Sequence, residues 1–322
     1  MGSPRVSVII RCYNEREHIG KLLYGVFQQT VEDVEVLLVD SGSTDGTLEK
    51  AREYPIDDVV YVSPEEFSFG RALNRGIEAA SGDFCVFASA HVYPKREDWL
   101  GSLLEMFAED VALVYGKQRG NEETKFPERQ IFRKWFPDKD RPRQETPFCN
   151  NANCAIRRSV WEEFPYDEEL PGLEDLDWAK RVREAGWDIS YASEATIVHV
   201  HDETPAEVYN RYRREALAHK RIMDEQEFTF GDFWKMFLYN TVMDYRTAVS
   251  EGELRSALLE IPRFRLMQFW GTYRGFAQDA PLSDRLWQRF YYPDTEGYPE
   301  DRDDRDIDYE QHNRAIDYTP VE

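Results

Sequence analysis

Two groups of side chains in this sequence have the chemistry of a catalytic site. The first is the acidic pair Glu174-Asp175, at the predicted start of a helix. A carboxylate held beside a hydroxyl group can take its proton and make the oxygen a nucleophile, so this pair is the strongest candidate for a general base. Asp177 is a further carboxylate nearby. Its presence is better explained by the favourable effect of negative charge at a helix N-terminus than by a role in catalysis.

The second group consists of three histidines. His199 and His201 lie two residues apart on a predicted strand and therefore share one face, and His91 follows another predicted strand. Imidazole nitrogens suit Mn²⁺ or softer ions better than Mg²⁺, which prefers oxygen ligands. Each histidine could equally be an ordinary core or surface residue, so a metal site here is a hypothesis.

A polar loop with two glycines follows the apolar strand predicted over residues 34–40, and Asp40 ends that strand. Ligands of open α/β sheets bind at the carboxyl ends of strands, so Asp40 could accept a hydrogen bond from a nucleotide base. Asp40 and Asp45 could instead be turn and capping residues only, because aspartate commonly has those roles.

The elements that must position these residues alternate between strands and helices. This alternation predicts an α/β fold with a mostly parallel central sheet flanked by helices. From Thr204 onwards the pattern is helical. Strands are predicted over residues 6–10, 34–40, 58–63, 84–88, 111–115, 154–157, 189–191 and 196–201, and the later helices over 206–224, 230–249, 253–259 and 262–278.

The same pattern divides the chain into three parts. Residues 1–202 form the α/β domain and residues 203–292 a helical C-terminal region. Residues 293–322 form a tail with eleven acidic residues against three arginines and few large apolar ones, which we expect to be mobile.

Residues 117–148 show little periodicity and are predicted to be a long loop. Between Lys125 and Arg143 this segment has seven basic residues against three acidic ones. The local excess could face an anionic ligand such as a phosphate, or it could belong to a solvated loop.

The whole chain is strongly acidic, with 62 Asp and Glu against 40 Lys and Arg and a net charge of -22. This charge argues against non-specific nucleic-acid binding. The chain has 30 Arg but only 10 Lys, and such an acidic, lysine-poor surface suits a protein that works at high salt.

The four cysteines have no Cys-x-x-Cys spacing and are expected to be reduced and structural. Without a signal-peptide pattern or a run of ~18 apolar residues, the sequence predicts a cytoplasmic setting.

Several motifs, in their order along residues 4–202, resemble those of the inverting family 2 glycosyltransferases, which have the GT-A fold. The resemblance is closest to the rhamnosyltransferase-like members, which add a helical C-terminal region. The matching segments are VIIRCYNE (8–15), VDSGSTDGT (39–47), GRALNRG (70–76), FCNNAN (148–153) and the pair Glu174-Asp175.

The resemblance implies an enzyme that moves a sugar from a nucleotide-sugar donor to a glycan or lipid-linked saccharide acceptor by single displacement. It implies that Asp175 is the catalytic base, that Glu174 supports it, and that Asp40 holds the donor base. Arg71 and Asn74 share a helix face, although ordinary surface polarity would also explain them. The remaining implied donor-binding residues are Tyr13, Asn14, Glu15, Ser89 and Ala90.

The sequence departs from the family at Ser89-Ala90-His91, where most members have an Asp-x-Asp motif that binds a divalent cation. The resemblance thus implies Mn²⁺ or Mg²⁺ held by changed ligands, His91 with His199 and His201, which match a His-x-His of many relatives. The missing carboxylates favour an alternative function, a non-catalytic nucleotide-sugar-binding homologue in a glycan-assembly complex. A nucleotidyltransferase is less well supported, because no Gly-rich phosphate loop is followed by a lysine.

Residues 261–276 have three arginines, no acidic residue and several aromatic side chains. A basic helix with aromatic residues can lie on an anionic membrane surface, which would suit a lipid-linked acceptor. A helix packed on the catalytic domain is the alternative that we favour.

Overall fold

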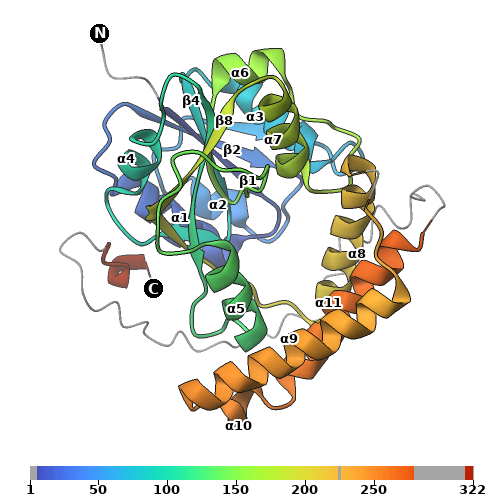
Figure 1. Cartoon of the computed structure of the whole chain (residues 1–322). Coiled ribbons are helices and arrows are strands. Elements are labelled where there is room, and N and C mark those ends of the chain that lie inside the picture. Colours follow the sequence, from blue (N-terminus) through green and yellow to red (C-terminus); the bar gives the residue numbers. More distant parts are fainter. Residues whose placement is uncertain (1–5, 224–225, 279–315, 322) are drawn as a thin grey trace.

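The computed structural model describes residues 6–223, 226–278 and 316–321. Its centre is an eight-stranded sheet with the strand order β3-β2-β1-β4-β7-β6-β8-β5 (Figure 1). No helix in these ranges is long and apolar enough to cross a bilayer. The strands are β1 (Val6–Cys12), β2 (Val34–Asp40), β3 (Asp58–Tyr61), β4 (Phe84–Ser89), β5 (Val92–Pro94), β6 (Val111–Arg119), β7 (Asn153–Arg157) and β8 (Asp188–His199).

Four of the strand pairings are parallel, namely β1–β2, β2–β3, β1–β4 and β6–β8. Strand β7 runs antiparallel to both of its neighbours, and β5 runs antiparallel to β8. The mostly parallel sheet is therefore confirmed. The two strands predicted over 189–191 and 196–201 are wrong as separate elements, because β8 is continuous and its pairing with β6 is only interrupted by a register shift after Gly116.

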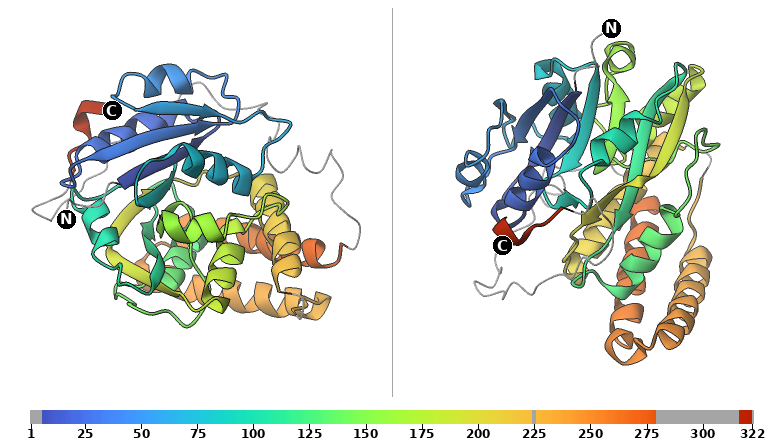
Figure 2. Two further views of the ribbon diagram at one scale, coloured as in Figure 1. Left: turned by 90° about the horizontal axis from the view of Figure 1, so that it is seen from above. Right: turned by 90° about the vertical axis from the view of Figure 1, so that its left-hand side faces the viewer.

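Buried side chains of the central strands alternate between the two faces of the sheet. On β1, Val8 and Ile10 pack in one core cluster and Ile9 in the other, as the two-residue period of a strand requires. Helices therefore cover both faces (Figure 2). The first cluster includes residues of α1 (Arg16–Phe27), α2 (Thr47–Ala51) and α4 (Trp99–Leu104), and the second residues of α3 (Phe69–Ala79), α6 (Arg158–Glu163) and α7 (Glu174–Glu184).

The prediction of a long loop over residues 117–148 is wrong, because this segment contains helix α5 (Phe126–Trp135). Several contacts that hold α5 come from residues more than one hundred positions away along the chain. Arg129 pairs with Glu253, and the backbone N–H of Phe126 donates to Glu260 Oε1 at 2.6 Å. Local periodicity cannot reveal a helix that depends on such distant contacts.

The four helices predicted after Thr204 are confirmed, with shifted ends. Helix α11 packs along α8, and a Cβ atom on Gly271 would lie 2.5 Å from the carbonyl oxygen of Tyr209, so only glycine permits this approach. Arg265 of α11 is buried and forms a bidentate ion pair with Asp244 of α9. The helices are α8 (Pro205–Ile222), α9 (Phe230–Glu251), α10 (Leu254–Ala257) and α11 (Glu260–Phe276).

The described end of the predicted tail, residues 316–321, lies against the α/β domain (Figure 2). Ile316 and Tyr318 are buried there in a cluster with Tyr93, and the Tyr318 hydroxyl donates to the carbonyl oxygen of Pro94 at 2.5 Å. Glu322 and residues 293–315 of the predicted tail lie outside the described residues.

Candidate active site

Two loops at the carboxyl ends of β1 and β2 are held together by hydrogen bonds. Asn14, with a φ of 52°, accepts from the backbone N–H of Thr44 at 2.8 Å, and its own N–H donates to Ser43 Oγ at 3.0 Å. The backbone N–H of Glu15 donates to Thr47 Oγ1 at 2.8 Å. Tyr13 lies in the same loop, partly exposed. The two segments predicted to bind a donor nucleotide therefore form one rim of the sheet.

Asp40 orders the second of these loops. Its carboxylate accepts hydrogen bonds from the backbone N–H groups of Gly42 at 3.0 Å and Ser43 at 3.2 Å, and the residue is only 1% exposed. Asp40 therefore has the turn role that its sequence position left open. A contact between Asp40 and a nucleotide base stays a prediction.

Arg71 and Asn74 share a face of α3, as their spacing predicts, and both bind Glu168. Asn74 also donates to the Tyr166 carbonyl oxygen and accepts from Trp161 Nε1 and the Tyr166 N–H. These four hydrogen bonds use the full capacity of a buried amide side chain, so Asn74 anchors the segment 161–168 to α3.

The acidic pair begins α7 and is buried, with Glu174 6% and Asp175 9% exposed. Leu173, just before the pair, has a φ of 53°, a left-handed conformation that is unfavourable for a branched side chain. Asp175 accepts from the backbone N–H groups of Leu176 at 2.8 Å and Asn151 at 3.2 Å. The pair is thus fixed in place by its own helix and by the neighbouring loop.

Burial raises the pKa of Asp175 to about 7, and the adjacent Glu174 charge adds to this effect. The two backbone N–H groups and Arg11 oppose it. Arg11 Nη1 lies 3.2 Å from Glu174 Oε1, which keeps a cation beside the second carboxylate. A carboxylate whose pKa lies near neutrality can both accept and release a proton at physiological pH, as a general base must.

Asp177, one turn into α7, has a different environment. Its carboxylate accepts from Arg181 Nε at 2.8 Å on the same helix. This ion pair four residues along the helix supports the helix-charge interpretation rather than a catalytic one.

The three histidines predicted as metal ligands are brought together. Their ligand atoms lie within 4.8 Å of one another, and His199 Nε2 is 2.8 Å from His201 Nε2. The His91 ring is stacked on that of His199, with centroids 5.1 Å apart. Burial and the two other histidines hold the pKa of His199 well below its usual range, which keeps this imidazole neutral, as a metal ligand must be.

Each histidine is oriented through its Nδ1 atom. Nδ1 of His91 lies 2.7 Å from Glu15, and Nδ1 of His199 lies 2.7 Å from Gln118 Oε1. The third, His201 Nδ1, lies 2.7 Å from Glu128. Carboxylate or amide oxygens on Nδ1, with Nε2 left for the ion, are the usual support for metal-binding histidines. The residues present therefore fit a divalent metal ion.

Arg211 of α8 completes this support from the helical region. Its Nη2 atom lies 2.7 Å from Glu128 Oε1, which is almost fully buried. Burial alone would raise the pKa of Glu128, but Arg211 and His201 outweigh it and hold the pKa well below its usual range. Glu128 is thus a fixed negative charge behind His201.

Residues 11–15 connect the two groups. Arg11 contacts Glu174, its carbonyl oxygen accepts from the backbone N–H of Ala90, and Glu15 contacts His91. Ser89 ends β4 opposite Arg11 in the parallel register. The end of β1 and the loop after it therefore lie between the acidic pair and the histidines.

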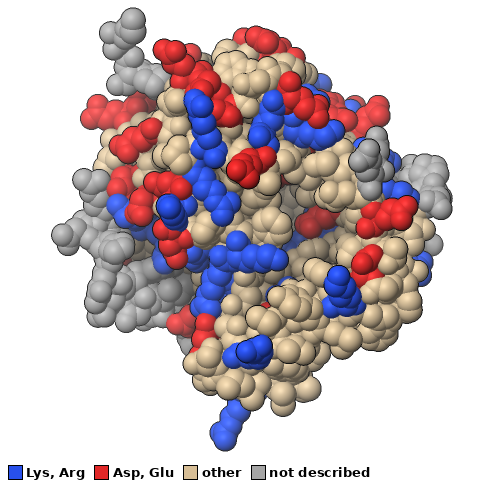
Figure 3. Space-filling model, in the orientation of Figure 1, with Lys and Arg blue, Asp and Glu red and all other residues tan. Residues whose placement is uncertain are grey.

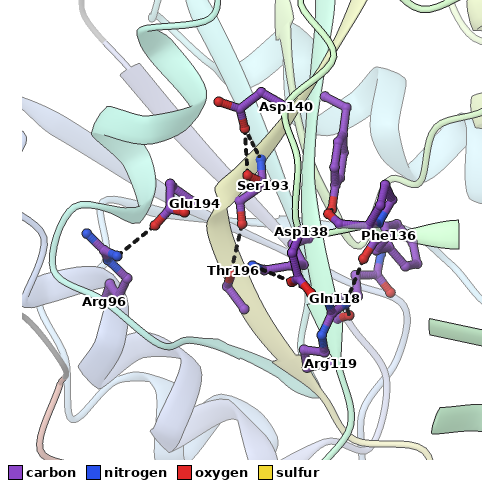
Figure 4. Close-up of polar contacts among 12 residues, drawn as sticks. Arg96, Gln118, Arg119, Phe136, Asp138, Asp140, Ser193, Glu194 and Thr196 are labelled. Carbon is purple, nitrogen blue, oxygen red and sulfur yellow. Dashed lines mark hydrogen bonds and ion pairs between the residues drawn. The ribbon is translucent and has the colours of Figure 1, made fainter. Parts of the chain in front are cut away.

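Most of the basic side chains between Lys125 and Arg143 form ion pairs within the protein. Four of the seven basic residues pair with acidic side chains: Lys125, Arg129, Arg133 and Arg143. Two aspartates also anchor the segment after α5 to the sheet. Asp140 accepts hydrogen bonds from the N–H and the hydroxyl of Ser193, both at 2.7 Å, and Asp138 accepts one from Arg119 Nη2 at 2.6 Å (Figure 4). These contacts favour a structural role over an anion site.

Sequence reasoning missed the supporting residues. Arg11 and Asn151 lie inside quoted motifs but were given no role. Nothing local marks Gln118, Glu128 or Arg211 as supports of the histidines, because the contacts Gln118–His199, Glu128–His201 and Arg211–Glu128 join residues 73 to 83 positions apart along the chain.

The chain matches a family model described as glycosyl transferase family 2 over residues 7–164. It is 29% identical over 223 residues to the O-antigen chain rhamnosyltransferase WbaN of Salmonella anatum, covering 65% of this chain and 70% of that protein. It is 30% identical over 207 residues to the glycosyltransferase AglE of Haloferax volcanii, covering 61% and 67%. A mannosyltransferase from Pyrobaculum calidifontis, solved with GDP-Man and Mn²⁺, has the same fold, with a TM-score of 0.57, 20% identity and 85% of both chains covered.

Proposed function

Because this chain belongs to glycosyl transferase family 2, we propose that Glu174, Asp175 and the loops after β1 and β2 form its active site. The protein is a glycosyltransferase that uses a nucleotide-sugar donor. The alternative of a non-catalytic homologue is not favoured, since the named relatives are transferases.

The observation that carries the proposed mechanism is the buried, near-neutral Asp175. A carboxylate oxygen of Asp175 takes the proton of the acceptor hydroxyl. The freed oxygen attacks the anomeric carbon of the donor sugar, a carbon–oxygen bond forms, and the bond to the diphosphate breaks on the opposite face. The nucleoside diphosphate leaves with the bonding electrons, and the configuration at the carbon is inverted. Glu174, paired with Arg11, keeps the base in position.

The donor nucleotide is proposed to bind along the rim formed by Tyr13, Asn14, Glu15 and the loop behind Asp40. Ser89 and Ala90, at the end of β4, adjoin this rim. Arg71 and Asn74 support the pocket from α3 through Glu168.

His91, His199 and His201 are proposed to hold a divalent ion, and Mn²⁺ fits imidazole ligands better than Mg²⁺ does. When bound, the ion offsets the negative charge of the donor diphosphate. Residues 1–202 are the catalytic domain in this proposal. Residues 203–292 support it, since Arg211 of α8 fixes Glu128 behind His201.

The acceptor is proposed to be a glycan or a lipid-linked saccharide, by similarity to relatives named for O-antigen chain synthesis. A panel of nucleotide sugars, with and without Mn²⁺, tests the function through donor binding and release of the nucleoside diphosphate. We expect one donor to bind and to be slowly hydrolysed without acceptor. If no donor binds or turns over in the presence of Mn²⁺, the proposal is wrong.

A further inference from the structure

Exposed apolar side chains are concentrated in one part of this molecule. Ten of the twelve large apolar residues that are exposed in the described part of the chain lie between residues 230 and 266. Leu259 is 80% exposed and Tyr239 62%. Contiguous apolar surface of this kind marks an interaction site more often than scattered single residues do.

Most of these residues form one surface along α9. Trp234, Leu238 and Val242 are spaced four residues apart, so they lie on the same side of the helix, and Val249 continues this side. Another side of α9 is buried through Phe233, Asp244 and Ala248. Figure 1 shows α9 and α10 at the edge of the molecule farthest from α6. We call Trp234, Leu238, Val242 and Val249, with Leu258 and Leu259 just beyond α10, the α9 face.

The acidic residues of this region do not contribute to the α9 face. Glu251 and Glu253 pair with Arg133 and Arg129 of α5. Glu260 accepts from the backbone N–H of Phe126, and Asp244 is buried against Arg265. The remaining acid, Asp232, caps the start of α9 through Thr229. Each of these carboxylates is therefore engaged in a contact within the protein.

Cations, in contrast, are left on the surface. Lys235 and Arg246 of α9, Arg255 of α10 and Arg263 of α11 are exposed. None of the four forms an ion pair with another residue that the structure describes. The whole chain has a net charge of -22, yet Figure 3 shows the lower part of the molecule as mostly uncharged, with scattered blue side chains.

An apolar surface bordered by cations fits an anionic lipid bilayer. Apolar side chains enter the interface, and each Lys or Arg near an anionic surface adds about 1 kcal/mol. A second copy of the chain would bring the same cations opposite one another, which is unfavourable. Helix α11, for which packing on the catalytic domain was favoured over a membrane surface, packs on α8 and α9 and contacts α5 of the α/β domain.

We propose that the α9 face docks this protein on an anionic membrane surface. The inference concerns where the protein works, and it stands independently of the catalytic assignment. Combined with the proposed function, it favours an acceptor carried by a membrane lipid.

Co-sedimentation of the full chain with vesicles tests this proposal. We expect binding to vesicles of phosphatidylcholine with phosphatidylglycerol, and much weaker binding to phosphatidylcholine alone. The variant W234S/L238S/V242S should lower the partition coefficient at least tenfold, and K235E/R246E should remove the preference for anionic vesicles. Brominated lipids should quench fluorescence in the wild type, and Trp234→Phe should lose most of that quenching.

The matched control is Y61S/W135S, which changes the two large aromatic residues that are exposed outside this region in the described part of the chain, and it should bind as the wild type does. Thermal unfolding checks that each variant is folded. If W234S/L238S/V242S does not fold, the binding of K235E/R246E to anionic vesicles tests the proposal instead. The proposal is overturned if the wild type does not sediment with anionic vesicles, or if all variants bind equally. It is also overturned if light scattering shows a dimer that the triple substitution dissociates and that does not bind vesicles.

Discussion

At the residue scale, burial is what changes an ordinary aspartate into a candidate base. Asp175 and Asp177 lie two residues apart on one helix, yet only Asp175 is buried beside a second carboxylate. Asp177 has an arginine partner and partial exposure. The sequence distinguishes them only by resemblance to a family, because the environment of each comes from β1 and the loop at Asn151.

The raised pKa of Asp175 makes a prediction about stability. The unfolded chain has an ordinary aspartate, whereas the folded pKa is about 7. The folded state therefore binds this proton more tightly, so stability from this group is full at low pH and is lost as pH rises towards 7. Asp175→Asn should raise the melting temperature relative to the wild type more at pH 8 than at pH 5. An equal or smaller gain at pH 8 would contradict the shifted pKa.

The histidine cluster predicts metal binding that can be measured without turnover. Titrating the protein into Mn²⁺ should remove the six-line electron paramagnetic resonance signal of the free ion. His91→Ala should weaken binding at least tenfold, and Gln118→Leu should weaken it about tenfold or more, because His199 loses the partner that orients it. His219→Ala is the control, because His219 is not part of the cluster. Wild-type affinity in His91→Ala would exclude this cluster as the site.

Residue types and spacing were enough to predict that His199 and His201 lie together, and the structure brings their rings into contact, although β8 ends at His199 and His201 lies just beyond the strand. They were not enough for Asn74. Its hydrogen bonds go to residues 161–168, and nothing near Asn74 in the sequence indicates them. The motifs thus indicate which residues belong to the site, but they do not reveal the contacts that each residue makes.

At the element scale, strand and helix periodicity predicted nearly every element of the α/β domain. The three-residue strand β5 was not predicted. Two further errors concern α5, which is stabilised by α9 and α11, and β8, which looked like two strands because Ser193 and Glu194 interrupt its apolar pattern. Both errors arise where distant contacts outweigh local pattern. The C-terminal helices were predicted from their pattern alone, and in the structure Thr204 and Thr229 begin α8 and α9 with capping boxes.

The packing of α11 on α8 depends on the absence of a side chain at Gly271. Gly271→Ala should destabilise the protein by about 1–3 kcal/mol, because the added Cβ meets the Tyr209 carbonyl oxygen and the helices must separate. Gly231→Ala is the matched control, since the nearest atom to its Cβ would be 3.6 Å away. Chemical denaturation measures both. Equal stability of the two variants would refute the close approach.

At the scale of the whole molecule, charge governs stability. With a net charge of -22, repulsion opposes the compact state, and dissolved salt screens it. The melting temperature should therefore rise from low to molar KCl. A melting temperature that is unchanged or lower in molar KCl would contradict this account.

The central claim is that Asp175 is the base of a glycosyl transfer. Once the panel has identified a donor, Asp175→Asn should lower the transfer rate at least 10³-fold while leaving the donor dissociation constant within about threefold of the wild type. Asp177→Asn, on the same helix, should retain most of the transfer rate. Near-wild-type transfer by Asp175→Asn would contradict the account.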